Sequence, residues 1–119
     1  MKHILVVDDE KHICELYKSE LEEEGYRVTL AHSGKEALTS IEKDRPDLIV
    51  LDIQMPGMDG IETLERLIGS DKGIPVILNT AYSHYRDDFS TWGAEAYIVK
   101  SSDISILKSE IKRLLGDEP

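Results

Sequence analysis

The sequence is poor in cysteine and in long apolar runs. Its single cysteine, Cys14, excludes an internal disulfide bond, which agrees with a reducing cytosol. No apolar segment approaches the roughly 20 residues that a membrane-spanning helix needs, and the N-terminus lacks the apolar core of a signal peptide. We therefore expect an unanchored cytoplasmic protein without a membrane partner.

Basic residues are also scarce relative to acidic ones: 14 Lys and Arg stand against 24 Asp and Glu, a net charge of −10. Proteins that bind the phosphate backbone of nucleic acids depend on clustered Lys and Arg, so we expect no direct nucleic acid binding. Part of the acidic excess, such as the run Glu22–Glu24, is typical of a solvated surface.

Linkers, repeats and low-complexity segments are absent. A chain of 119 residues, 40% hydrophobic and 32% charged, has the size and composition of one globular domain. We expect this domain to span residues 1–116, followed by a short tail at residues 117–119.

Short apolar runs alternate with amphipathic segments along the chain. The runs predict five strands: His3–Val7, Tyr26–Ala31, Asp47–Leu51, Ile74–Leu78 and Glu95–Val99. The first, third and fourth are almost continuously apolar, as expected for strands covered on both faces. The second, YRVTLA, alternates between apolar and polar residues, which favours an edge position.

The segments between and after these runs have helical periodicity, and Ser83–Trp92 is the weakest of them. Their expected inward residues are Ile13, Leu16, Tyr17 and Leu21; Ala37, Leu38 and Ile41; Ile61, Leu64 and Ile68; Phe89 and Trp92; and Ile104, Leu107, Ile111 and Leu114. Ser33 and Glu36 form a capping-box pattern, and Asp103 can cap the last helix. Strict alternation predicts an α/β fold, a parallel sheet with helices on both faces.

Polar residues follow four of the predicted strands. They are Asp8 and Asp9, Asp52, Asn79 and Thr80, and Lys100. Each has an ordinary structural explanation by itself, such as a helix cap, a turn or a solvated lysine. Together they favour a binding site, because open parallel sheets bind ligands beyond the carboxyl ends of their strands. The second strand ends in Ala31-His32, where we see no evident chemistry.

Three carboxylates at one edge of a sheet repel one another. A like-charged pair about 4 Å apart costs roughly 4 kcal/mol at the effective dielectric constant near a protein surface. A divalent cation removes this repulsion, and an all-oxygen cluster suits Mg²⁺. With the amine of Lys100 and the hydroxyl of Thr80, the cluster suits phosphoryl transfer to Asp52 as the nucleophile.

Four motifs connect these residues to a known family. They are ILVVDDE, DLIVLDIQMPGMDG, VILNTA and AYIVK, which occur in this order and at suitable intervals over nearly the whole chain. Together they resemble the receiver domain of bacterial two-component response regulators. The resemblance implies a flavodoxin-like, doubly wound fold, like that of the chemotaxis receivers. It has a five-stranded parallel sheet in the order 2-1-3-4-5 and five helices on two faces.

The resemblance also implies how the site works in a phosphorelay. Asp52 is expected to accept a phosphoryl group from a sensor histidine kinase or a phosphotransferase. Mg²⁺ would bind to Asp9, Asp52 and the backbone carbonyl of Gln54, with Asp8 nearby or acting through water.

Further residues match the switch of the family. Thr80 matches its hydroxyl, Lys100 the amine that pairs with the phosphoryl group, and Tyr97 an aromatic whose rotamer follows the switch. The surface formed by residues 83–92, 95–99 and the last helix would then control an output domain or a downstream protein. Such a domain catalyses its own phosphorylation and dephosphorylation and is a switch rather than a turnover enzyme. A homodimer through the last helix is compatible with the sequence, although no residue requires one.

One position departs from the family pattern. The family usually has a proline after the lysine, in a cis peptide that helps to aim it, and this chain has Ser101 there. A cis bond before a non-proline residue costs about 2.5–4 kcal/mol, so a trans bond with a different aim of Lys100 is an alternative. The same departure motivates the main alternative function, a receiver-shaped interaction module that is never phosphorylated.

Two other functions fit the sequence less well. A flavodoxin-like flavin binder needs a phosphate loop rich in Ser, Thr and Gly after the first strand, where Asp8-Asp9-Glu10 would repel a phosphate. A phosphatase of the haloacid-dehalogenase type has a second Asp two residues after its nucleophile, where this chain has Gln54.

Overall fold

A five-stranded parallel sheet organises the protein. The computed structural model describes residues 1–53, 60–70, 73–81, 93–100 and 103–116. Within these ranges the elements are β1 (His3–Val7), α1 (Lys11–Glu23), β2 (Arg27–Ala31), α2 (Gly34–Lys43), β3 (Leu48–Leu51), α3 (Gly60–Ser70), β4 (Val76–Thr80), β5 (Ala96–Val99) and α4 (Ser105–Leu115).

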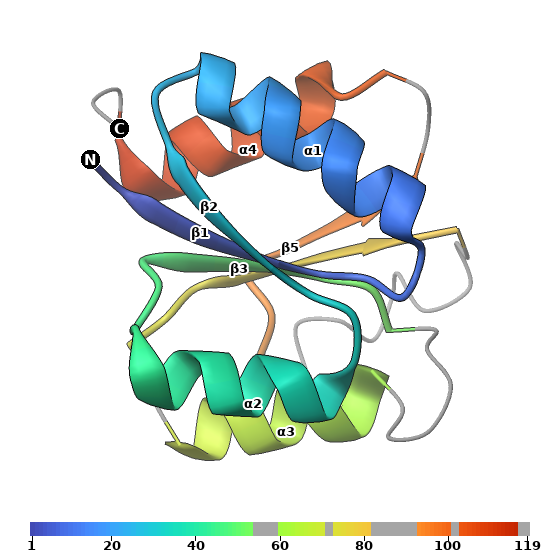
Figure 1. The fold of residues 1–119 in the computed structure, drawn as a ribbon, viewed down its shortest axis with the longest axis vertical. Coiled ribbons are helices and arrows are strands. Elements are labelled where there is room, and N and C mark those ends of the chain that lie inside the picture. The colour runs from blue at the N-terminus through green and yellow to red at the C-terminus, as the bar shows by residue number, and fades with distance from the viewer. Residues whose placement is uncertain (54–59, 71–72, 82–92, 101–102, 117–119) are drawn as a thin grey trace.

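The sheet has the order β2-β1-β3-β4-β5, and every neighbouring pair is parallel. Helices α1 and α4 cover one face, and α2 and α3 cover the other (Figure 1). The α/β class, the strand order and the edge position of β2 are thus confirmed. The helix expected at Ser83–Trp92 lies outside the described residues, as do Gln54, Ser101 and the tail at 117–119.

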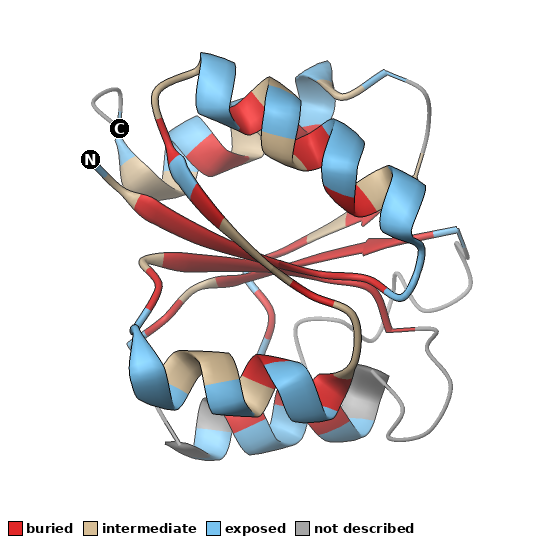
Figure 2. Cartoon of the chain, viewed as in Figure 1, coloured by how far each residue is buried: buried red, intermediate tan, exposed pale blue. Residues whose placement is uncertain are grey.

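Side chains of each strand alternate between two apolar layers. In β1, Ile4 and Val6 join the core under α1 and α4, whereas Leu5 and Val7 join the core over α2 and α3. All four are buried, as are both faces of the central strands (Figure 2). This double burial explains the continuous apolar runs of the sequence, because a strand covered on both sides has no solvent face.

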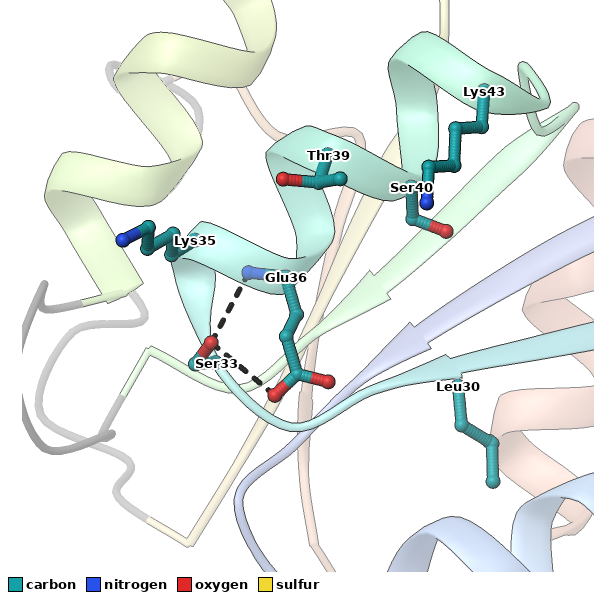
Figure 3. A pocket seen from close by; sticks show the side chains of 7 residues that line it. All are labelled: Leu30, Ser33, Lys35, Glu36, Thr39, Ser40 and Lys43. Carbon is teal, nitrogen blue, oxygen red and sulfur yellow. Dashed lines mark hydrogen bonds between the residues drawn. The ribbon is translucent and has the colours of Figure 1, made fainter.

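The helix ends show which local signals act. The hydroxyl of Ser33 accepts a hydrogen bond from the backbone N–H of Glu36 at 3.1 Å, so the expected cap of α2 is confirmed (Figure 3). Asp103 accepts from the N–H of Ser105 at 2.9 Å at the start of α4, and this bond holds the pKa of Asp103 below its usual value. Gly25 follows α1 with a φ of 98°, a conformation that glycine adopts easily.

Two expectations about packing and length are wrong in detail. Leu16 was expected to face the core but is 49% exposed, and Cys14 is fully buried instead. The buried stripe of α1 consists of Cys14, Tyr17 and Leu21, so Leu16 lies roughly 130° around the helix from its centre. Strand β4 runs on to Thr80 rather than ending at Leu78, because β5 pairs with it as far as Thr80 and Val99.

No helix in these ranges has the length and apolar character that crossing a bilayer requires.

A buried polar pair joins α1 to β4. The amide Nδ2 of Asn79 donates to the hydroxyl of Tyr17 at 2.7 Å, and both residues are less than 5% exposed. Burial raises the pKa of Tyr17 although the bond from Asn79 acts against it, so the hydroxyl stays protonated. Because a buried polar group without a partner is costly, the two side chains depend on each other.

We expect the pair to show coupling in unfolding experiments. Tyr17→Phe removes the acceptor and leaves the Asn79 amide buried without it, which should lower the free energy of unfolding by about 1–3 kcal/mol. Adding Asn79→Leu removes the other partner as well and should restore part of the loss. Urea unfolding of the two single variants and the double variant measures this coupling, and strictly additive losses would contradict it.

Candidate functional site

The polar residues that follow the strands are held by an extension of the sheet's hydrogen bonds. The N–H of Asp8 donates to the carbonyl of Ala31 at 3.0 Å, and that of Asp52 to the carbonyl of Val7 at 3.0 Å. On the other side, the N–H of Lys100 donates to the carbonyl of Thr80 at 2.7 Å. The backbone therefore fixes where each of these side chains begins.

Side-chain alternation decides on which side of the sheet these residues continue. Asp8 follows Ile4 and Val6 at steps of two, so it lies in line with residues that face α1 and α4. The same spacing relates Asp52 to Leu48 and Val50, and Lys100 to Ala96 and Ile98. Register and alternation thus direct all three side chains to one side of one edge.

The structure brings Asp8, Asp9 and Asp52 together. One carboxylate oxygen of each lies within 4.8 Å of the other two. Asp8 and Asp52 are 2% and 4% exposed, whereas Asp9 lies on the surface, so the cluster has a buried floor and a side open to solvent. An all-oxygen donor set of this kind fits a divalent cation such as Mg²⁺. The fourth expected ligand, the carbonyl of Gln54, lies outside the described residues.

Lys100 lies between the two buried carboxylates. Its Nζ is 2.7 Å from Oδ2 of Asp8 and 2.8 Å from Oδ2 of Asp52, and its side chain is 10% exposed. The ammonium group therefore reaches Asp52 with serine at position 101. A third carboxylate, Oε1 of Glu10, lies 3.7 Å away. The position of Glu10 in the Asp-Asp-Glu run of the sequence does not indicate a contact with Lys100.

Burial and charge act in opposite directions on these groups. For Lys100, burial acts to lower the pKa, but the hydrogen bonds and charges of Asp52 and Asp8 outweigh it and raise the pKa above its usual value. For Asp8, burial dominates and raises the pKa, although bonds from Lys100 and from the N–H of Glu10 at 3.0 Å oppose it. Lys100 consequently remains a cation, and Asp8 binds a proton more readily than an exposed aspartate does.

The two remaining expected residues lie on the last two strands. Thr80 ends β4 and is fully buried, and its spacing from Val76 and Leu78 puts it in line with the residues that face α2 and α3. Tyr97, in β5, is partly buried and packs against the same core. Thr80 thus approaches the carboxyl edge of the sheet from the side opposite to Lys100.

No chemistry was evident for His32 from the sequence, but its ring contacts the main chain of Asp8. Its Nδ1 lies 3.3 Å from the main-chain carbonyl oxygen of Asp8, to which the thiol of Cys14 also donates at 3.3 Å. The contact is made to the backbone, so no pattern of residue types in the sequence could indicate it. The expectation that Cys14 is a small packing residue is confirmed in that it is fully buried.

Two surface hollows of the described residues lie away from this cluster. One, of about 390 Å³, lies between β2 and α2 and is lined by Leu30, Ser33, Lys35, Glu36, Thr39, Ser40 and Lys43 (Figure 3). Another of about 390 Å³ is lined by residues of α2 and α3. Neither hollow is lined by a strand-end acid.

Relatives of known name match almost the whole chain. Sporulation initiation phosphotransferase F of Bacillus subtilis is 39% identical over 94% of this chain and 92% of its own length. The transcriptional regulatory protein YkoG of the same organism is also 39% identical, and response regulator MprA of Mycobacterium tuberculosis is 38% identical. The chain spans 50% of the length of each of these last two proteins.

Solved structures of similar proteins have the same fold. The response regulator TrrA of Thermotoga maritima, in complex with Mg²⁺ and BeF, is 49% identical, with a TM-score of 0.90 over 96% of this chain and 99% of that one. TrrA in complex with the histidine kinase ThkA matches with a TM-score of 0.89 over 98% of this chain and 100% of that one.

The family model of the response regulator receiver domain matches residues 4–112, which include the acid cluster and all strand residues of the described ranges except His3. This chain therefore belongs to the receiver domains of two-component response regulators.

Proposed function

We propose that Asp52 is the phosphoryl acceptor of this receiver domain and that a sensor histidine kinase or a phosphotransferase is the donor. A carboxylate oxygen of Asp52 attacks the phosphorus of a phosphohistidine. A new P–O bond forms, the P–N bond breaks, and the imidazole leaves with the electron pair and takes up a proton. The observation that carries the proposal is the Lys100 ammonium 2.8 Å from Asp52, within a cluster of three carboxylates.

Each residue of the site has a separate role in this transfer. Asp52 is held at the end of a buried strand, so the attacking oxygen needs little reorientation. Lys100 already lies beside that carboxylate as a cation, where it can pair with an oxygen of the incoming phosphoryl group. Thr80 would turn toward the same group from the opposite side of the sheet, and Tyr97 would follow it.

Asp9, Asp52 and the carbonyl of Gln54 would hold Mg²⁺, with Asp8 nearby or acting through water. The bound ion would offset the negative charge of the three carboxylates and of the transferred phosphoryl group. The donor set of the cluster supports this assignment, and so does the Mg²⁺ in the TrrA complex.

Kinase and output roles follow from the same family. The complex of TrrA with the histidine kinase ThkA supports a kinase of that class as a partner of this chain. We place the output on the surface of β5 and α4 together with residues 83–92, through which an output domain or a downstream protein would be controlled. We expect no direct nucleic acid binding by residues 1–116. A homodimer through α4 is compatible with this function. The single cysteine, Cys14, which cannot form an internal disulfide bond, supports a cytoplasmic location.

Phosphorylation can be tested directly with a small-molecule phosphodonor and Mg²⁺. We expect intact-mass spectrometry to find one added phosphoryl group on the wild-type protein and none on Asp52→Asn, because an amide is a poor nucleophile. Asp47→Asn, a substitution at the opposite end of β3, is the matched control and should be phosphorylated like the wild type. An unmodified wild type would instead favour the interaction module that is never phosphorylated.

Metal binding should stabilise the folded protein. Mg²⁺ at about 100 times its dissociation constant should add about 2.7 kcal/mol to the free energy of unfolding and raise the melting temperature. Asp9→Ala should abolish this rise, whereas Glu23→Ala, which removes an exposed acid of α1, should retain it. Equal melting temperatures of the wild type with and without saturating Mg²⁺ would count against the metal site.

Lys100 should stabilise the metal-free protein. Lys100→Met leaves Asp8 and Asp52 buried without their counter-charge, which should lower the free energy of unfolding by about 3 kcal/mol. Mg²⁺ then neutralises the same carboxylates, so it should raise the melting temperature of the variant more than that of the wild type. Lys108→Met, which removes the ion pairs with Glu20 and Glu24, is the control and should show an ordinary Mg²⁺ response. A variant as stable as the wild type without Mg²⁺ would refute this role.

A further inference from the structure

Three groups from three elements meet beneath the acid cluster. The Nδ1 of His32, the Sγ of Cys14 and the carbonyl oxygen of Asp8 are separated by 3.3 Å, 3.3 Å and 3.6 Å. His32 directly follows β2, Cys14 lies in α1, and Asp8 directly follows β1. Cys14 is fully buried, and His32 is partly buried.

The chemistry of the three groups determines which of them donate. A carbonyl oxygen only accepts, and it has two lone pairs. Burial, with the charges of Asp8 and Glu15, raises the pKa of Cys14 to about 11, so the sulfur carries a hydrogen that it can donate. If Nδ1 of His32 carried no hydrogen, its lone pair would face the carbonyl lone pairs at 3.3 Å and repel them. The alternative, in which Nδ1 accepts from the Cys14 thiol at 3.6 Å, keeps this repulsion, so the contacts favour a ring that presents an Nδ1–H to the Asp8 carbonyl.

These contacts fix the main chain from which the acids extend. The N–H of Asp8 is bound to the carbonyl of Ala31, so the end of β2 holds both polar groups of the Asp8 main chain. The Asp8 carbonyl belongs to the peptide that leads to Asp9, and its orientation therefore sets the direction in which the chain continues. A shift of this peptide would move the Asp8 and Asp9 carboxylates relative to Asp52.

We propose that His32 is a positioning residue of the metal site, whose Nδ1–H, together with the Cys14 thiol, holds the Asp8 carbonyl and keeps the Asp8–Asp9 segment in place for cation binding. The inference rests on the proposed function of the cluster as an Mg²⁺ site. In this way β2, which supplies no metal ligand, contributes to the site through the residue that follows it. Groups behind a metal ligand affect metal affinity through orientation alone, without touching the ion.

Two substitutions of similar shape separate the hydrogen bond from the packing. His32→Asn keeps an N–H donor at the position of Nδ1, whereas His32→Leu has the same branching at Cγ and no donor. His12→Leu is the control, because it removes an exposed histidine of α1. Isothermal titration calorimetry with MgCl₂ gives the affinity of each variant, and phosphorylation by a small phosphodonor over a range of Mg²⁺ gives the half-saturating concentration.

We expect His32→Leu to weaken Mg²⁺ binding by about tenfold and to raise the half-saturating Mg²⁺ by a similar factor. The phosphorylation rate at saturating Mg²⁺ should stay close to that of the wild type. His32→Asn should regain most of the affinity, and His12→Leu should bind Mg²⁺ like the wild type. Unchanged affinity in His32→Leu, or no recovery in His32→Asn, would overturn the positioning role while leaving the phosphorylation of the wild type intact. A wild type that fails to bind Mg²⁺ would refute the proposed metal site and the positioning role together.

The tautomer of His32 provides a test that needs no metal. In protein with ¹⁵N-labelled histidine at alkaline pH, the resonances that disappear in His32→Asn should belong to a ring protonated at Nδ1. A ring protonated at Nε2 would contradict the inference, even if His32→Leu failed to fold.

Discussion

The pairing of one ammonium group with two buried carboxylates is the interaction on which the site depends. Asp8 and Asp52 are nearly inaccessible to water, and two such anions at the end of a hydrophobic sheet would oppose folding. Lys100 removes most of this opposition because its Nζ contacts both of them. The strands β1 and β3 can therefore be continuously apolar up to the residues before Asp8 and Asp52.

The parallel register is what makes this pairing available to residues 92 positions apart. Val7 pairs with Leu51, and Thr80 pairs with Val99, so each strand delivers its next residue to the same edge. Alternation then sends Asp8, Asp52 and Lys100 to the side of α1, and Thr80 to the side of α2. Side chains from both sides of the sheet thus reach the site, so a change at the acid cluster can affect the helices packed on either face.

The sequence predicts those parts of the protein that follow from periodicity and strand ends. Continuous apolar runs identified the buried strands, and the alternation of Tyr26–Ala31 identified the edge strand. The polar residues after four of the runs pointed to the acids, Thr80 and Lys100. Contacts that depend on the exact rotation of a helix were not predictable. Leu16 and Cys14 are two residues apart on one amphipathic helix, and only packing against the sheet decides that Cys14 is the buried one.

Contacts made to the backbone, or between buried polar groups, were equally hidden. Asn79 follows an apolar run as a turn residue would, yet its amide lies inside the core against Tyr17, 62 positions away. His32 and Glu10 likewise belong to the site through distances that only the folded chain defines.

Several of these hidden contacts lie next to the acids: His32 and Cys14 contact the Asp8 carbonyl, and Glu10 approaches Lys100. Tyr17 and Cys14 lie in α1, and both have a raised pKa because of burial and the nearby negative charge of Asp8. Helix α1 thus brings two uncharged groups near Asp8, the Cys14 thiol, which donates to the Asp8 carbonyl, and the Tyr17 phenol, while Asp9 keeps the other side of the cluster open to solvent. A cation or phosphoryl group that arrives from solvent meets charged groups, and the thiol and phenol on the protein side are neutral. Because the charged groups lie on the solvent side, ligands can exchange there. The neutral groups on the protein side separate these charges from the apolar core.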